Sequence, residues 1–360
     1  MTSEISDWFR TAVEAARATG HRSHLETVLD PINIFADPPT EPAPNWPPTA
    51  LHHTTSSASP LATVVITRSR PPAVVELLLR GPAAQQSDYQ GHGAFPARWR
   101  SGTFWLARYA QGPYVVRHGR HVVIAVTDDA CALTWTDRIL REVLIHGGRT
   151  HGFRLCHSAA LALGEDHGLL ITGASGAGKT DLALKLSQAL AAPVVTVDRG
   201  ILGHRDGQLT IGTLPFGLNI HHGTLAALGA VDETLASQCP PAQGKHYLSV
   251  TQAQRRCHVT LRPWARITGV IAVARSADSP THLRRLAHHE IRAALAAADT
   301  VDSDPGYQTD WLGLAPTSSP ERRPPDDRLA GWLLHYRPQD GLPRDWIADL
   351  TNSALPAATL

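Results

Sequence analysis

The sequence has little charge: charged residues make up 18% of its 360 residues, and the formal net charge is +1. A chain this close to neutrality has no electrostatic reason to bind nucleic acid or an anionic membrane surface. It also lacks an apolar run long enough to span a bilayer, and its first residues lack the basic start and apolar centre of a signal peptide. These absences predict a cytoplasmic protein that binds neither nucleic acids nor membranes.

Patterns typical of metal sites and disulfide frameworks are missing as well. The four cysteines, Cys131, Cys156, Cys239 and Cys257, show no C-x-x-C spacing. The twenty histidines include adjacent pairs, but no H-x-x-x-H or H-E-x-x-H pattern. Adjacent side chains on a strand or helix point apart, so these pairs do not predict a metal centre.

Composition and periodicity predict five segments. These are an N-terminal helix at 1–36, a Pro-rich linker at 37–60, a β-rich domain at 61–150, an α/β domain at 151–300 and a C-terminal extension at 301–360. Within them we expect a helix over residues 1–30 and β-strands through 61–133, including 73–81. Asp206-Gly207 predicts a hairpin, residues 282–297 have helical periodicity, and residues 329–360 are compatible with one or two short helices.

What the sequence does contain is a glycine-rich motif between an apolar run and a helical pattern. The run Leu169–Thr172 precedes G-x-x-x-x-G-K-[ST], and Asp181–Leu186 follows with helical spacing. In this context backbone N–H groups cradle a polyphosphate, the lysine binds the β/γ-phosphates and the hydroxyl ligates Mg²⁺. The predicted nucleotide-binding residues are Gly173, Ala174, Ser175, Gly176, Ala177, Gly178, Lys179 and Thr180.

Further candidates lie on either side of this motif. Asp198 ends the apolar run that follows the motif helix. Its carboxylate is a candidate general base or Mg²⁺ ligand. Alternatively, it only caps a turn before Gly200. His157 precedes the motif, and is an active-site group or a core histidine. Basic residues downstream of the motif either contact the γ-phosphate or are solvated loop charges. They are Lys245, Arg255, Arg256, Arg262 and Arg266, of which Lys245 is the first to test.

The run from Cys156 to Arg199 resembles the C-terminal catalytic domain of the HPr kinase/phosphorylase family, including its divergent members associated with natural-product or peptide-modifying pathways. In that family a histidine opens a strand–turn–strand unit, a G-x-x-G-x-G-K-[ST] loop and an acidic residue follow, and a strand ends in an Asp pair. The matching residues are His157, Gly173–Thr180, Asp181 and Asp198. The resemblance extends over residues 150–300, under half of the chain.

This resemblance implies an α/β fold with a P-loop and a mixed-sheet core of the phosphoenolpyruvate-carboxykinase-like or HPr-kinase-like kind, beside a β-rich N-terminal domain. It implies that His157 and Asp198 are active-site residues, that Asp181 belongs to the nucleotide site, and that the protein is a homo-oligomer. The sequence departs from the family at Arg199, which replaces the second aspartate. We therefore expect a kinase without the reverse activity, or altered chemistry. The family's signature around a glutamate in the later substrate-binding loop is not visible either, so we expect an acceptor other than HPr.

The leading hypothesis is a Mg²⁺-dependent kinase that uses ATP or GTP and phosphorylates a hydroxyl of a small molecule or of a peptide Ser or Thr. Lys179 would bind the phosphates, Thr180 and Asp198 would hold Mg²⁺, and Asp198 and His157 would act on the acceptor. The alternative is a nucleotide-binding regulator with weak or no transfer, because one carboxylate is missing at Arg199. A transport or motor ATPase is disfavoured, since no L-S-G-G-Q-like sequence is present.

Overall fold

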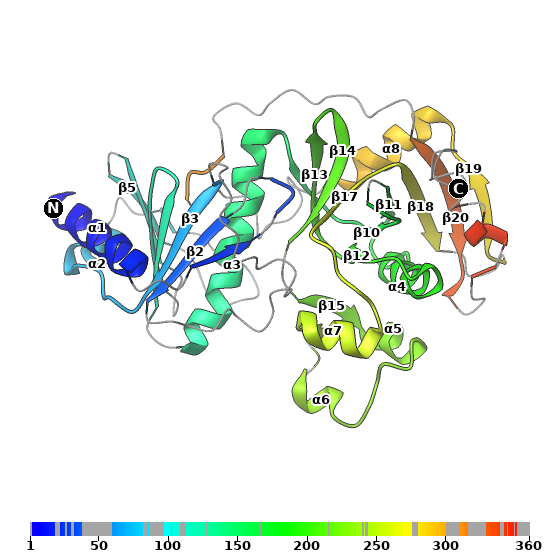
Figure 1. The fold of residues 1–360 in the computed structure, drawn as a ribbon, viewed down its shortest axis with the longest axis horizontal. Coiled ribbons are helices and arrows are strands. Elements are labelled where there is room, and N and C mark those ends of the chain that lie inside the picture. The colour runs from blue at the N-terminus through cyan, green and yellow to red at the C-terminus, as the bar shows by residue number, and fades with distance from the viewer. Residues whose placement is uncertain are drawn as a thin grey trace. The chain divides into compact units, whose positions relative to one another are not determined.

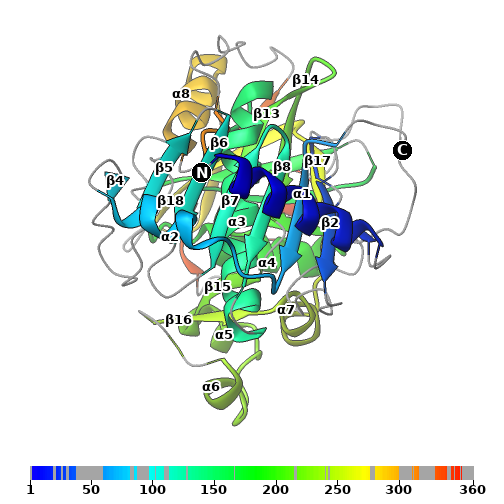
Figure 2. The same ribbon diagram turned by 90° about the vertical axis from the view of Figure 1, so that its left-hand side faces the viewer.

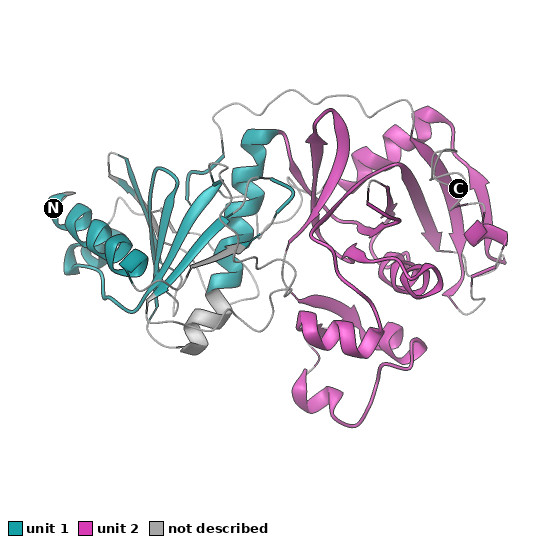
Figure 3. Ribbon diagram, viewed as in Figure 1, with its two compact units in different colours: residues 1–43, 51–151, 302–320 teal, residues 44–50, 152–301, 321–360 magenta. Residues whose placement is uncertain are grey.

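In the computed structural model the chain forms two compact units, coloured separately in Figure 3. Unit 1 comprises residues 1–43, 51–151 and 302–320, and unit 2 comprises residues 44–50, 152–301 and 321–360. Nearly all of the predicted linker at 37–60 lies outside the described residues. The structure describes residues 2–18, 22–25, 27–29, 32–37, 60–81, 85–86, 97–101, 103–108, 113–126, 129–165, 167–214, 217–239, 241, 244–275, 280–299, 310, 312–315, 329–338, 342–343, 345–348 and 350.

Unit 1 is built on an eight-stranded sheet with the order β1-β2-β3-β8-β7-β6-β5-β4. β3 pairs in parallel with β2 and β8, and the remaining neighbours are antiparallel, as the sequence mostly predicts. The strands are β1 (Arg22–Leu25), β2 (Ile32–Asp37), β3 (Ala62–Thr67), β4 (Gln85–Gln86), β5 (Ala97–Ser101), β6 (Phe104–Arg108), β7 (Tyr114–His118) and β8 (His121–Ala125).

Two helices, α1 (Thr2–Ala18) and α2 (Ala73–Arg80), lie across one face of this sheet (Figure 2). The longer α3 (Asp129–Gly148), followed by the short 3-10 helix η2 (Arg149–His151), packs against β3. The strand predicted at 73–81 is wrong. Val75 and Leu79 are one helical turn apart and both buried, and Pro72 stands at the N-cap, where a proline suits a helix start.

The buried histidine of α3 makes unit 1 sensitive to acid. His146 is fully buried, and among the described residues neither ring nitrogen has a hydrogen-bond partner. The pKa of His146 is lowered from 6.5 to about 4, mainly by burial; the charge of Asp310 opposes this shift, and the charges of Arg149 and Arg138 add to it. The folded protein therefore binds this proton more weakly than the unfolded chain does.

We expect the stability of unit 1 to fall as the pH decreases from 6.5 to about 4, and to lose no more from this group below that value. The loss amounts to about 3 kcal/mol. Urea unfolding at a series of pH values measures it, and His146→Leu, which cannot titrate, should flatten this part of the profile. An unchanged slope in that variant would contradict the assignment.

The described residues of unit 2 form three sheets. The six-stranded sheet has the order β12-β10-β11-β18-β20-β19, in which β11, β18 and β20 are parallel and the other pairs antiparallel. A four-stranded antiparallel sheet has the order β17-β14-β13-β9, and β15 pairs with β16. The fold is thus a mixed α/β arrangement with mixed sheets.

The helices and strands of unit 2 are labelled in chain order, where there is room, in Figure 1. They are β9 (Arg154–Cys156), β10 (Ala159–Ala162), β11 (Gly168–Thr172), α4 (Lys179–Leu190), β12 (Val194–Thr196), β13 (Gly200–Arg205), β14 (Gln208–Thr213), β15 (Leu218–His221), α5 (His222–Ala227), α6 (Leu235–Gln238), β16 (Lys245–Leu248), α7 (Val250–Cys257), β17 (Trp264–Arg266), β18 (Gly269–Arg275), β19 (His282–Arg285), α8 (His288–Ala298) and β20 (Ala330–Tyr336).

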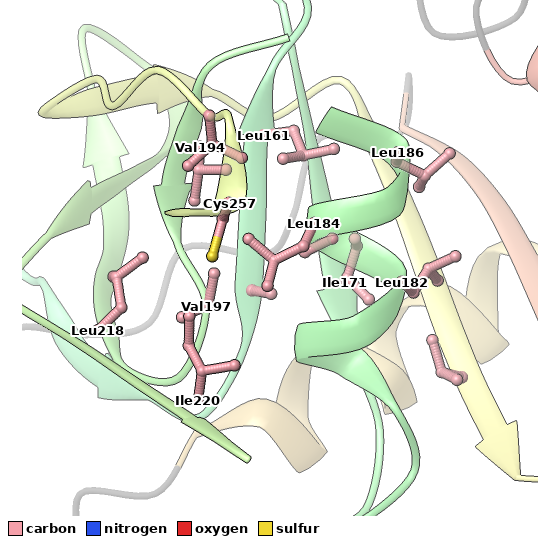
Figure 4. Close-up of a cluster of buried hydrophobic side chains, with 14 of the residues drawn as sticks. Leu161, Ile171, Leu182, Leu184, Leu186, Val194, Val197, Leu218, Ile220 and Cys257 are labelled. Carbon is pink, nitrogen blue, oxygen red and sulfur yellow. The ribbon is translucent and has the colours of Figure 1, made fainter. Parts of the chain in front are cut away.

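The six-stranded sheet is covered on both faces. Alternate residues of a strand point to opposite faces, so Leu169 and Ile171 of β11 pack with α4, whereas Leu170 packs with Ile291 of α8. Figure 4 shows Leu182 and Leu184 of α4 around Ile171 in the hydrophobic cluster between β11 and α4. Both faces of β11 are buried, which fits its apolar residues Leu169, Leu170 and Ile171, and its last residue, Thr172, is buried at the start of the loop that follows.

Three predictions from periodicity are wrong in detail. The helix predicted over residues 1–30 ends at Ala18, and β1 then pairs with β2. Residues 282–285 form β19, and only the part from His288 is helical. Residues 330–336 form β20 in place of a helix, because pairing with β18 and β19 buries Trp332, Leu334 and Tyr336 at the two-residue spacing of a strand.

None of the helices among the described residues is long and apolar enough to cross a membrane.

Candidate functional site

The glycine-rich loop, residues 173–178, connects β11 to α4, so the predicted strand, loop and helix are present. Three of its glycines have positive φ: 150° at Gly173, 76° at Gly176 and 99° at Gly178. Other residues adopt such angles only with strain. Gly173 also has no room for a side chain, because a Cβ there would lie 2.3 Å from the carbonyl oxygen of Val273. The turn from strand into helix therefore depends on glycine.

Lys179 is the first residue of α4, where backbone N–H groups without helical partners favour an anion. Its side chain is buried and bends back over the loop, with Nζ donating to the carbonyl oxygens of Gly173 at 2.9 Å and Ala174 at 3.0 Å. Burial lowers the pKa of Lys179; Asp198 opposes this and Lys245 adds to it. A buried cation beside the N–H groups of a helix N-terminus can hold an anionic group such as a polyphosphate.

The ends of β11 and β12 lie at the same edge of the six-stranded sheet, because both strands run antiparallel to β10. Asp198 comes two residues after β12. Thr180 joins the two segments, since its Oγ1 donates to the Val197 carbonyl oxygen at 2.8 Å. The structure thus brings the threonine and the aspartate of the prediction to neighbouring segments.

His157 reaches the same edge from the start of β10. Its Nε2 lies 3.3 Å from Asp198 Oδ1, and its backbone N–H donates to the Ala298 carbonyl oxygen. Burial alone would raise the pKa of Asp198, but the hydrogen bond from His157 and the charges of Lys245 and Arg199 lower it to about 2. Asp198 is therefore a carboxylate at every physiological pH, with an imidazole beside it.

Lys245, at the start of β16, belongs electrostatically to the same site, because its charge acts on both Asp198 and Lys179. The chain has only three lysines, and the third, Lys185, is also on α4. In contrast, Arg256 pairs with Asp232 at 2.8 Å, and Arg262 donates to the carbonyl oxygens of Gly164 and Glu165.

The remaining members of the basic set lie on other elements. Arg255 is exposed on α7, and Arg266 lies on β17 in the four-stranded sheet. Of the five cations considered from the sequence, the structure therefore connects Lys245 with the site.

Asp181, predicted from the family resemblance to belong to the nucleotide site, lies in a buried polar cluster behind the loop. Its Oδ2 accepts from the hydroxyl of Tyr336 and lies 2.9 Å from Lys185 Nζ. Tyr336 is the residue that sequence reasoning missed. It is far from the motif in the chain and lies in a segment predicted as helix, so no local signal connects it with the loop.

No protein-family model matches the chain, and no curated protein sequence matches it. Among solved structures it is similar to the Hpr(Ser) kinase/phosphatase from Coxiella burnetii, with 13% sequence identity and a TM-score of 0.28. The match covers 56% of this chain and 87% of that protein. At this level of similarity, the chemistry of the site has to be derived from its own residues.

Proposed function

We propose that unit 2 is a kinase domain that binds ATP or GTP with Mg²⁺ and transfers the γ-phosphoryl group to a hydroxyl of a small molecule or of a peptide Ser or Thr. One observation supports this most strongly. The Asp198–His157 pair, at 3.3 Å, lies at the same sheet edge as the glycine-rich loop, and Thr180 is bonded to the residue before Asp198. A loop for binding phosphate and an ionised carboxylate for the reacting group are then side by side.

The residues present fit a nucleotide and Mg²⁺. Gly173 lets the start of the loop pack directly against the Val273 backbone of β18, the loop ends at the N-terminus of α4, and Lys179 supplies a buried cation there. Mg²⁺ takes one or two protein ligands and completes its shell with water and substrate phosphates, for which the Thr180 hydroxyl and the Asp198 carboxylate suffice. When bound, the ion neutralises charge on the β- and γ-phosphates.

In the proposed reaction the acceptor oxygen bonds to the γ-phosphorus while the bond to the β–γ bridging oxygen breaks and leaves the nucleoside diphosphate. Asp198 receives the hydroxyl proton, or it would hold the metal while the neighbouring His157 receives that proton, and both roles of Asp198 need the carboxylate form that its surroundings favour. His157 Nε2 orients Asp198 Oδ1. Lys179 and Lys245 provide positive charge for the transferred group.

The finer fold is part of this proposal. The strands β10 and β12, antiparallel to β11, make the sheet next to the loop mixed rather than purely parallel. A mixed sheet is what the HPr-kinase-like or phosphoenolpyruvate-carboxykinase-like core requires, and it supports that assignment over a parallel P-loop kinase.

A nucleotide-binding regulator is the second candidate, and Arg199 supports it. Arg199 stands beside Asp198 where the family has a second carboxylate, and its charge acts on Asp198. A cation at this point reduces the negative charge that could hold metal ions. The regulator would bind nucleotide at the loop and transfer little or nothing.

The two candidates are separated by incubating the full chain with ATP labelled at the γ-phosphate, Mg²⁺ and a fractionated cell extract. The kinase transfers label to a discrete peptide or small-molecule acceptor, and omission of Mg²⁺ abolishes this. Nucleotide binding by calorimetry with no labelled acceptor in any fraction supports the regulator. Absence of nucleotide binding contradicts both.

A further inference from the structure

Tyr336, the last residue of β20, lies directly under the glycine-rich loop. A Cβ on Gly178 would lie 2.9 Å from Cδ1 of the Tyr336 ring, and Gly178 is the N-cap residue of α4. The side chain is fully buried, and its hydroxyl donates to Asp181 Oδ2 in the first turn of the same helix. Ring and hydroxyl thus contact the chain on both sides of Lys179 and Thr180.

Lys185 completes the contact from one helical turn further along α4. Its Nζ forms an ion pair with Asp181 Oδ2 at 2.9 Å, and donates to the Tyr336 hydroxyl at 3.2 Å and to the Pro338 carbonyl oxygen at 2.7 Å. The hydroxyl therefore donates to a carboxylate and accepts from an ammonium group. Burial and the Asp181 carboxylate raise the pKa of Tyr336, so its proton stays in place for donation. Buried networks whose members are all paired hold a unique geometry.

The strand pairing connects this cluster to the other side of the loop. β20 lies in parallel register beside β18, with Tyr336 opposite Arg275, and β18 contributes Val273, whose carbonyl oxygen abuts Gly173. Both ends of the loop are thus set by the two neighbouring strands: Gly173 by β18 and Gly178 by β20. A helix N-terminus binds phosphate well only if its N–H groups are held in place beforehand.

We infer that Tyr336 is a positioning residue for nucleotide binding, which holds the first turn of α4, and with it Lys179 and Thr180, against β20 through Gly178 and Asp181. The inference rests on the proposed function, and it makes Asp181 a support of the loop instead of a ligand of the nucleotide. It also gives the segment that contains β20 a part in the nucleotide site.

Tyr336→Phe keeps the ring and removes the hydroxyl. We expect the Kd for Mg²⁺-ADP, measured by calorimetry on the full chain, to rise about tenfold, since hydrogen bonds to charged groups contribute at this level. The KM for ATP should rise similarly, while kcat for slow transfer to water, which needs no acceptor, changes less than about threefold. If the hydroxyl only stabilises the fold, Tyr336→Phe lowers the melting temperature but does not raise KM while leaving kcat nearly unchanged.

Tyr114→Phe is the matched control. Its hydroxyl also donates to a carboxylate, that of Glu76, but in unit 1. This variant should leave the Kd for Mg²⁺-ADP unchanged. Asp181→Asn combined with Tyr336→Phe should weaken binding by less than the product of the single effects, because the two groups act through one contact.

The measurements on these variants separate the positioning role of Tyr336 from the proposed function of unit 2. If the unaltered protein binds Mg²⁺-ADP and Tyr336→Phe binds equally well, or loses kcat alone, the positioning role is wrong and the proposed function stands. If the unaltered protein binds no nucleotide, the proposed function fails and the inference fails with it. If Tyr336→Phe does not fold, Lys185→Met tests the same cluster from α4, and unchanged nucleotide affinity in that variant overturns the inference.

Discussion

Replacement of Lys179 by alanine is expected to reduce phosphoryl transfer by about 10²- to 10³-fold, the range found when one electrostatic stabiliser of a transition state is removed. The Nζ group lies against the loop carbonyls of Gly173 and Ala174, in a position to turn toward phosphates. Because alanine has a high helix propensity, α4 should still form. Affinity for ATP, measured by calorimetry, should fall as well.

Arg255→Ala is a suitable control for this variant. It also removes one positive charge from a helix of unit 2, but Arg255 is exposed on α7 and should not affect transfer. Equal activity of Lys179→Ala and the unaltered protein, with equal melting temperatures, would contradict the role of the loop in phosphate binding.

Replacement of Asp198 by asparagine is expected to reduce phosphoryl transfer by about 10²- to 10⁴-fold. This is the contribution typical of a general base, and we expect a similar loss if the carboxylate holds Mg²⁺. Asparagine has nearly the same shape and keeps an oxygen that can accept from His157 Nε2, so the fold should persist. The lost quantity is the negative charge. We expect Mg²⁺-dependent transfer to fall by this factor while binding of metal-free nucleotide to the loop remains.

Asp206→Asn is the matched control. Asp206 lies in the β13–β14 turn with 79% of its side chain exposed and a φ of 52°, which asparagine tolerates well. Its activity should equal that of the unaltered protein. Near-normal transfer by Asp198→Asn would exclude the catalytic and metal roles of this carboxylate and favour its reading as a turn residue.

Local signals in the sequence were sufficient for several elements. Glycines between an apolar run and a helical pattern predicted β11, the loop and α4, and Asp206-Gly207 predicted the β13–β14 hairpin; the structure confirms both. Residues 73–81 and 329–336 were assigned to the wrong class, as short apolar runs fit helix and strand periods alike. Their class is decided by packing: α2 against the sheet of unit 1, and β20 between β18 and β19.

The site divides in the same way. Lys179, Thr180, Asp198 and His157 were named from the sequence, and the structure brings all four to one edge of a sheet. Their roles in binding and transfer remain predictions that the variants above test. The sequence ranked Lys245 first among the basic residues to test but could not exclude the arginines, because which of their charges acts on Asp198 depends on the tertiary fold of unit 2.

By itself, then, the sequence determined what the chemistry of neighbouring residues determines: a turn that only glycine can make, and a lysine and a threonine at the start of a helix. Only the tertiary structure decided which distant groups support them. Asp181 turns to Tyr336 and Lys185, and Asp198 to His157. Asp181 and Lys185 are one turn apart on α4, but the contacts with Tyr336 and His157 join segments far apart in the chain. The energy of these long-range contacts comes from the pairing and burial of whole strands, which no local pattern encodes.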